Sequence, residues 1–226
     1  MNKLVLFDID GTLITAGGAG TRSLNRAFQR LFGIEEAFRT ISMAGKTDPQ
    51  IMREGLKLNG MDHLDGNVDK MIGQYLFFLK EEIENPMRHI MPGIEESLDL
   101  FGEKGITIGL LTGNLEKGAK IKLNPFGIFD FFNSGAFGSD HEDRDELLPI
   151  ALEKYKKQGL EFSPKDCFVI GDTPRDVQCA KIHGAYCIAV ATGPYSVDDL
   201  RNTEADIVFE SLEDVDTCYS FIANSQ

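Results

Sequence analysis

Three short apolar runs in this sequence end in polar clusters, and this arrangement limits the possible folds more than any other feature. The first run, Leu4–Phe7, is followed directly by Asp8, Asp10 and Gly11. An uninterrupted apolar run of this length is typical of a strand that is buried on both faces of a parallel sheet. In open parallel sheets, ligands bind outside the carboxyl ends of the strands. The two carboxylates therefore occupy a position that suits catalysis.

The two later runs repeat this arrangement. Residues 108–111 lead into the segment Thr112–Asn114, and residues 167–170 lead into a segment that holds Asp172 and Asp176. A lone Asp-x-Asp sequence would more often be an acidic turn than a catalytic site. Because three strand ends carry such groups, the sequence favours one site at a shared edge of the sheet.

The segment between the first two runs has helical periodicity. Apolar residues recur at helical spacing over residues 24–32 and 68–83. Asp48 and Pro49 fit the start of another helix, because Asp can cap a helix and Pro suits its first position. The glycine-rich residues 17–20 are either a hinge or a plain loop before the first helix.

After residue 93, strands and helices alternate. The expected strands are 106–111, 131–136, 168–170 and 186–190, and the expected helices are 94–103, one after Leu115, one over 147–155 and a last one capped by Ser211. Such alternation predicts a parallel sheet with helical crossovers. The expected fold class is therefore α/β. A Rossmann-like parallel-sheet core would comprise residues 1–16 and 89–226, and a small α-helical cap domain would be inserted at residues 17–88.

Composition and charge exclude several classes of protein. Of the 226 residues, 42% are hydrophobic, which argues against disorder, and the formal net charge is −13. Such a charge gives no electrostatic reason to bind nucleic acid or an anionic membrane. No apolar run approaches the length of a membrane span or a signal peptide, so we expect a cytoplasmic protein. The four cysteines lack Cys-x-x-Cys spacing and are expected to be small buried residues without disulfides.

In this order, the three segments resemble the haloacid dehalogenase superfamily of phosphatases and phosphotransferases. The resemblance spans nearly the whole chain, and the spacing admits a cap after the first motif. It implies that Asp8 is the nucleophile and that Asp10 is the general acid and base. In the superfamily, an Asp two residues after the nucleophile accompanies phosphatases and phosphomutases, which speaks against dehalogenation. The alternative for Asp10 is a turn-forming residue before Gly11.

The expected cofactor is Mg²⁺. A carboxylate can attack a phosphate ester only if the repulsion between the two anions is screened, and Mg²⁺ prefers hard oxygen ligands. By resemblance, the ligands would be the Asp8 carboxylate, the backbone carbonyl of Asp10, and Asp172, with Asp176 binding directly or through water. The four histidines, His63 among them, have no paired spacing, which argues against zinc.

Groups that bind the phosphate can also be assigned. By resemblance, Thr112 binds the transferring phosphoryl group, and Gly113 and Asn114 open a helix with free backbone N–H groups. Family members usually carry a lysine between the third and fourth strands, where this sequence has Arg144. We expect Arg144 to replace that lysine, because its fork of N–H donors can hold phosphate. The alternatives are that Arg144 is a surface residue or that Lys154 takes the role.

The leading hypothesis is a Mg²⁺-dependent phosphatase of the phosphoglycolate phosphatase-like type. It would hydrolyse a small phosphorylated metabolite through an aspartyl-phosphate intermediate, as a monomer or weak homodimer. Lys46, in the polar turn 45–48, is either a contact to a second anionic group of the substrate or a solvated loop lysine. The nearest rival is a β-phosphoglucomutase-type sugar phosphomutase. A non-catalytic phosphate-sensing or interaction domain is a further alternative, although such a module has no need of a nucleophile paired with an acid.

Overall fold

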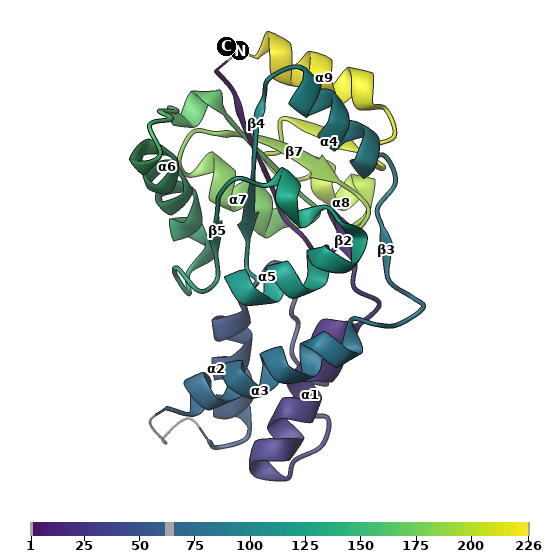
Figure 1. Ribbon diagram of the computed structural model, residues 1–226, viewed down its shortest axis with the longest axis vertical. Helices are drawn as coiled ribbons and strands as arrows, with labels where there is room; N and C mark the ends of the chain where they lie inside the picture. Colours follow the sequence, from purple (N-terminus) through teal and green to yellow (C-terminus); the bar gives the residue numbers. More distant parts are fainter. Residues whose placement is uncertain (1, 62–65, 226) are drawn as a thin grey trace.

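The centre of the protein is a six-stranded parallel sheet (Figure 1). The computed structural model describes residues 2–61 and 66–225. The strand order is β5-β4-β1-β6-β7-β8, and all neighbouring strands run parallel. The strands are β1 (Leu4–Phe7), β4 (Thr107–Thr112), β5 (Gly135–Phe137), β6 (Cys167–Gly171), β7 (Tyr186–Val190) and β8 (Ile207–Phe209). The α/β fold class expected from the sequence is therefore confirmed.

The apolar run of β1 explains its place in the middle of the sheet. Leu4 and Leu6 contribute to the core on one face, and Val5 and Phe7 contribute to the core on the other. All four residues are completely buried, as expected for a strand covered on both faces. The helices on the first face are α6 (Leu147–Lys157), α7 (Pro174–Lys181) and α8 (Val197–Arg201). Those on the second face include α4 (Ile94–Glu103), α5 (Glu116–Leu123) and α9 (Val215–Asn224).

Three further helices lie together beyond the carboxyl ends of the strands, in the lower part of Figure 1. They are α1 (Ala19–Phe32), α2 (Asp48–Leu58) and α3 (Asn67–Glu82). The chain enters and leaves this group through a short antiparallel pair, β2 (Ile14–Thr15) and β3 (His89–Ile90). This arrangement is consistent with an inserted cap, while the exact limits at residues 17 and 88 stay a prediction, as does a hinge at residues 17–20.

One strand is shorter than the sequence predicted. The strand expected at residues 131–136 comprises only Gly135–Phe137, and Phe129–Phe131 form a 3₁₀ turn. Phe132 packs edge-on against Phe7 with 6.1 Å between the ring centroids. The Phe132 side chain therefore fills the core, and its apolar character is not evidence for a strand.

The last helix begins later than the sequence predicted. It starts at Val215 and is capped by Asp214, whose carboxylate accepts a hydrogen bond from the backbone N–H of Thr217 at 3.1 Å. The proposed cap at Ser211 was therefore wrong. Helices α7 and α8 and strand β8 were not predicted at all. Strand β8 has 3 residues and α8 has 5, which is too short for hydrophobic periodicity to be recognised.

The cysteines agree with the expectation from composition. Cys167, Cys179, Cys187 and Cys218 are all buried free thiols. Within residues 2–61 and 66–225, no helix is long and apolar enough to cross a membrane. His63 lies outside the described residues.

A substitution at Gly93 tests how tightly the turn before α4 packs against the backbone of Leu212. Gly93 precedes α4 with a φ of +79°, and a β-carbon there would overlap the backbone carbonyl of Leu212. We expect Gly93→Ala to lower the free energy of unfolding by about 3 kcal/mol, combining backbone strain with steric overlap. Gly105 is the matched control, because it has a φ of +69° and a β-carbon added there would meet no atom within 4 Å. Gly105→Ala should cost only about 1 kcal/mol. Equal losses in urea titrations of the two variants would contradict this account.

Candidate active site

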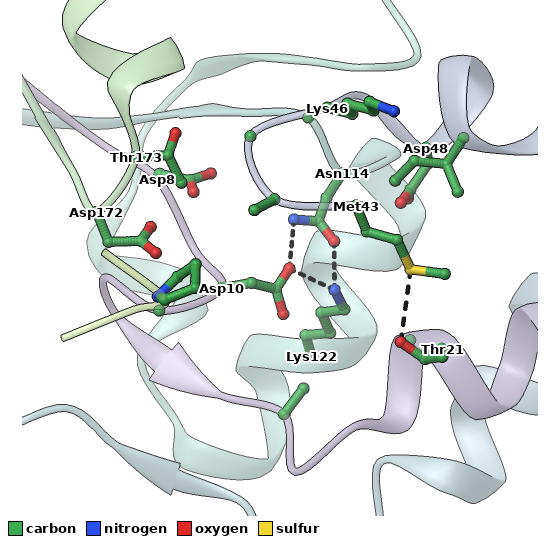
Figure 2. A pocket seen from close by; sticks show the side chains of 18 of the residues that line it. Asp8, Asp10, Thr21, Met43, Lys46, Asp48, Asn114, Lys122, Asp172 and Thr173 are labelled. Carbon is green, nitrogen blue, oxygen red and sulfur yellow. Dashed lines mark hydrogen bonds and ion pairs between the residues drawn. The ribbon is translucent and has the colours of Figure 1, made fainter. Parts of the chain in front are cut away.

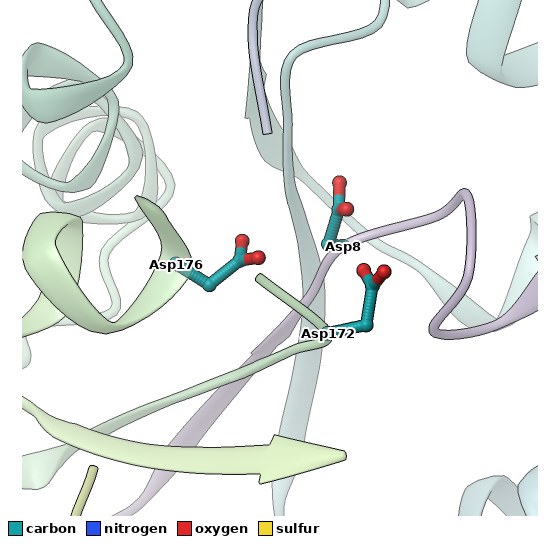
Figure 3. Close-up of side chains that lie close together, drawn as sticks. All are labelled: Asp8, Asp172 and Asp176. Atoms are coloured by element: carbon teal, nitrogen blue, oxygen red, sulfur yellow. The ribbon is translucent and has the colours of Figure 1, made fainter. Parts of the chain in front are cut away.

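Three carboxylates converge where the central strands end (Figure 3). Asp8 follows β1, Asp172 follows β6, and Asp176 lies in the first turn of α7. One carboxylate oxygen from each residue lies within 4.8 Å of the others, and all three side chains are buried. The carboxylates that the sequence predicted near the strand ends therefore lie together in the structure.

One buried guanidinium lies against this carboxylate cluster, defined as Asp8, Asp172 and Asp176. Nη2 of Arg144 is 3.2 Å from Oδ1 of Asp8 and also donates to Oδ1 of Asp176. Only 3% of Arg144 is exposed, and its Nε has no hydrogen-bond partner among the described residues. The alternative that Arg144 is a surface residue is thus wrong. One positive charge faces three carboxylates.

Burial shifts the pKa values of Asp8 and Asp172. Burial raises the pKa of Asp8 to about 6, against the Arg144 guanidinium, which lowers it. Burial, reinforced by the charges of Asp8 and Asp176, raises the pKa of Asp172 to about 8. The pKa of Arg144 is raised despite its burial, because Asp176 and Asp8 stabilise the cation. The site therefore lacks positive charge when its acids are ionised.

The surroundings of Asp172 suit a small cation with oxygen ligands. Its Oδ1 accepts a hydrogen bond from the Thr12 hydroxyl at 3.1 Å. Gly11 and Gly193 lie so close that a β-carbon on either residue would overlap the Asp172 carboxylate. Side chains are thus kept away from this carboxylate. The donor set consists of hard oxygen atoms, which Mg²⁺ prefers.

Asp176 has a structural task as well as a place in the cluster. Its Oδ2 accepts hydrogen bonds from the backbone N–H and the hydroxyl of Thr173, at 3.0 and 2.7 Å, which caps α7. Its Oδ1 is bound by Arg144. Both oxygens of Asp176 are therefore engaged, whereas Asp172 accepts a side-chain hydrogen bond only at Oδ1 among the described residues.

A second polar cluster, formed by Asp10, Asn114 and Lys122, lies beside the first (Figure 2). Nζ of Lys122 donates to Oδ2 of Asp10 at 2.5 Å and to Oδ1 of Asn114 at 2.6 Å. Nδ2 of Asn114 donates to the same Asp10 oxygen at 2.9 Å and to the Thr112 hydroxyl at 2.9 Å. These bonds fix the Asp10 carboxylate through one oxygen and leave Oδ1 free of protein partners in the described part of the chain.

Lys122 was not expected at the site from the sequence. It lies on α5 and is only 4% exposed. Burial lowers its pKa, but the charges of Asp10 and Asp48 more than offset this effect, so the pKa is raised. A signal was available, because Leu115, Ala119 and Lys122 follow the i, i+4, i+7 spacing of one buried helix face. A lysine in such a stripe needs a carboxylate partner inside the protein.

The loop before α2 is docked on the end of β4. The backbone N–H of Asp48 donates to the carbonyl of Gly113 at 2.7 Å, and Nη1 of Arg144 lies 3.4 Å from the carbonyl of Gly45. A β-carbon on Gly113 would overlap the carbonyl of Lys46. Glycine is required at position 113 because two backbones meet there.

The helix start at residue 48 differs from the sequence-based expectation. Thr47 is the cap of α2, and its hydroxyl accepts a hydrogen bond from the backbone N–H of Gln50 at 3.3 Å. Asp48 is therefore free of capping, and its Oδ2 accepts from the backbone N–H of Leu115 at 2.9 Å. Burial raises the pKa of Asp48 to about 6, against the charge of Lys122, which lowers it.

The two lysines considered as phosphate or substrate contacts are paired with carboxylates outside the cluster. Nζ of Lys46 is 2.5 Å from Oε2 of Glu54, and Figure 2 shows its amine pointing away from Asp8. Nζ of Lys154 is 2.6 Å from Oδ2 of Asp140. Arg144, rather than Lys154, is therefore the cation at the carboxylate cluster.

A cavity of about 300 Å³ connects the two clusters with the helices beyond the sheet. Asp8, Asp172 and Arg144 line one part of it, and Asp10, Asn114 and Lys122 line the middle. The remaining wall is formed by side chains and backbone of the helical group, including Thr21, Leu24, Met43, Asp48, Ile51 and Tyr75. The enclosed volume suits a small molecule.

Comparisons with known proteins agree with this architecture. The chain is 23% identical over 232 residues to a phosphoglycolate phosphatase of Vibrio vulnificus (strain YJ016), covering 93% of this chain and 92% of that protein. It is 27% identical over 198 residues to a phosphoglycolate phosphatase of Pseudomonas syringae pv. syringae (strain B728a), covering 84% of this chain and 70% of that protein.

Among solved structures, the fold is similar to that of CbbY from Rhodobacter sphaeroides in complex with phosphate. The TM-score is 0.77 at 17% identity, over 95% of this chain and 96% of that one. A sequence profile described as haloacid dehalogenase-like hydrolase matches residues 5–190, which include every residue of both polar clusters. The chain therefore belongs to the haloacid dehalogenase-like hydrolase family.

Proposed function

We propose that the protein is a Mg²⁺-dependent phosphatase that hydrolyses a small phosphorylated metabolite through an aspartyl-phosphate on Asp8. One observation carries this proposal: the buried carboxylates of Asp8, Asp172 and Asp176 lie close together, and Lys122 holds the Asp10 carboxylate beside them. The similarity to phosphoglycolate phosphatases supports the same reaction class.

Asp8, Asp172 and the backbone carbonyl of Asp10 would hold the metal ion. Both oxygens of Asp176 are engaged by Thr173 and Arg144, which favours binding of Asp176 to the ion through water. When bound, Mg²⁺ supplies positive charge that screens the repulsion between the Asp8 carboxylate and the phosphate.

Asp8 would form the covalent bond to phosphorus, and Asp10 would transfer the protons. A carboxylate oxygen of Asp8 forms a bond to phosphorus while the ester P–O bond breaks, and Asp10 gives its proton to the departing alkoxide. In the second half, Asp10 takes a proton from water, which attacks phosphorus and releases inorganic phosphate from Asp8. Because Lys122 and Asn114 hold Oδ2 of Asp10, Oδ1 is the atom that carries the proton.

Thr112, Gly113, Asn114 and Arg144 would bind the transferring phosphate. Residues 112–114 lead from β4 toward the start of α5, where the backbone N–H groups of Leu115 and Glu116 already donate to Asp48 and Ser139. The contacts to phosphate would therefore come from residues 112–114 themselves. Arg144 replaces the family lysine in this proposal, and its unpaired Nε–H adds a donor. Lys46 remains a candidate lid contact. A cytoplasmic location and a monomeric or weakly dimeric state remain predictions.

Loss of the nucleophile tests the reaction. Asp8→Asn keeps the size of the side chain but removes the attacking oxygen anion, so we expect turnover to fall by at least about 10³-fold. The measurement is phosphate release from a panel of phosphate esters with Mg²⁺, with Asp99→Asn, an exposed residue on α4, as the matched control. If the unmodified protein releases no phosphate from any ester, the non-catalytic alternative gains. Conversion of a hexose phosphate into an isomeric phosphate would instead indicate a phosphomutase.

Metal binding should be visible without turnover. Saturating Mg²⁺ at about 100 times its Kd stabilises the folded state by about 2.7 kcal/mol, which should raise Tm by about 5–10 °C. Asp172→Asn removes a charged ligand and should abolish most of this rise, whereas Asp99→Asn should keep it. Differential scanning fluorimetry measures the Tm of each variant with and without Mg²⁺. If Mg²⁺ raises the Tm of the Asp172 variant as much as that of the unmodified protein, the site as assigned is excluded.

The charge at Arg144 should matter for both folding and rate. Arg144→Met leaves buried carboxylates without their cation, and we expect a loss of about 3–5 kcal/mol in the free energy of unfolding. Arg144→Lys keeps the charge but not the fork, and kcat/KM should fall about 10- to 100-fold with a smaller loss of stability. Lys154→Met is the control, because Lys154 bonds to Asp140 outside the cluster. A kcat/KM for Arg144→Lys equal to that of the unmodified protein would show that the fork is dispensable.

A further inference from the structure

We propose that the part of the cavity between Lys122, Tyr75 and Asp48 is a subsite for an uncharged, polyhydroxylated leaving group. This inference rests on the proposed phosphatase function and narrows its substrate class to phosphate esters of sugars or other polyols. Three buried polar groups, the wall of the cavity and its charge balance lead to it.

Tyr75 offers an unused hydroxyl. It lies on α3, lines the cavity and is 1% exposed. Its hydroxyl forms no hydrogen bond with any residue of the described ranges. Because Tyr75 lines the cavity, a ligand hydroxyl there can both donate to this hydroxyl and accept from it.

Lys122 faces the same space as Tyr75. A β-carbon added to Gly20 would lie 3.7 Å from Nζ of Lys122 and 3.9 Å from the Tyr75 hydroxyl oxygen. Because Gly20 has no side chain, this space stays open between the two groups. Asp10 and Asn114 use two of the three N–H donors on Lys122, which leaves one for a ligand.

The charges of the cavity argue against an anionic leaving group. Every lysine or arginine that lines the cavity already has a carboxylate partner: Lys46 with Glu54, Lys122 with Asp10, and Arg144 with Asp8 and Asp176. Asp48 adds a buried carboxylate without an ion pair of its own among the described residues. A carboxylate on the leaving group would thus enter without a free cation and beside Asp48.

The rest of the wall agrees with a sugar-like ligand. Leu24, Met43 and Ile51 present apolar surface, while Thr21 adds a hydroxyl whose contact is a weak 3.5 Å hydrogen bond to the Met43 sulfur. The carbon skeleton of a polyol can lie on the apolar surface while its hydroxyls reach Tyr75, Lys122 and Asp48. The volume of about 300 Å³ suits a small ester of this kind.

The test compares three substrates on the full-length protein with Mg²⁺. Glycerol 3-phosphate has an uncharged polyol, 2-phosphoglycolate has a carboxylate, and 4-nitrophenyl phosphate is the reference that needs no polyol contacts. We expect kcat/KM for glycerol 3-phosphate to exceed that for 2-phosphoglycolate by at least tenfold. The ratio between these two values is the quantity that the inference predicts.

Two near-isosteric variants connect this preference to the subsite. Tyr75→Phe should lower the kcat/KM ratio of glycerol 3-phosphate to 4-nitrophenyl phosphate about tenfold. Tyr219→Phe, which removes a hydroxyl on α9 outside the cavity, should leave that ratio unchanged. Asp48→Asn can keep the hydrogen bond to Leu115 and removes the negative charge, so the ratio of 2-phosphoglycolate to glycerol 3-phosphate should rise about tenfold.

The outcomes separate this inference from the proposed function. If 4-nitrophenyl phosphate is hydrolysed but 2-phosphoglycolate is preferred over glycerol 3-phosphate, the subsite assignment is overturned and the phosphatase stands. Unchanged ratios in the Tyr75 and Asp48 variants would overturn it as well. If no phosphate ester is hydrolysed, the phosphatase proposal itself fails, and the subsite inference falls with it.

Discussion

Carboxylates that are buried together require compensating positive charge, and this requirement connects the separate parts of the protein. Asp8 and Asp176 share one guanidinium, Arg144, and Asp172 lies beside them without a cation of its own among the described residues. Arg144 also reaches the carbonyl of Gly45, and Asp176 also caps α7. Charge compensation at the end of the sheet therefore fixes a helix start and brings the loop before α2 to the site. A divalent cation would complete the compensation that a single arginine leaves unfinished.

A second charge balance organises the neighbouring part of the cavity. Lys122 bridges Asp10 and Asn114, and Asp48 lies beyond it on a helix from the inserted segment. The side chains that would handle the proton and those that would meet the leaving group are thus coupled through one buried lysine. In the proposed function, selectivity for the leaving group and orientation of Asp10 would both depend on the contacts of Lys122.

The sequence alone predicted much of the core, because its signals are local. The run Leu4–Phe7 predicted a central strand, and the strand ends predicted where Asp8 and Asp172 lie. Short or aromatic segments were predicted poorly. The region around Phe132 reads as a strand, yet its apolar character serves packing against Phe7. Periodicity cannot distinguish these two uses of an apolar residue in a short segment.

The sequence by itself determined the α/β class, the order of the strands along the chain and the acids at their ends, since each depends on neighbouring residues. Only the tertiary structure decided which distant side chains meet. It placed Arg144 rather than Lys154 at the acids, brought Lys122 to Asp10, and turned Asp48 from an expected helix cap into a wall of the cavity. The physical reason is that charge pairing acts through space, and the partners are separated along the chain by helices and strands whose packing sets the final distances.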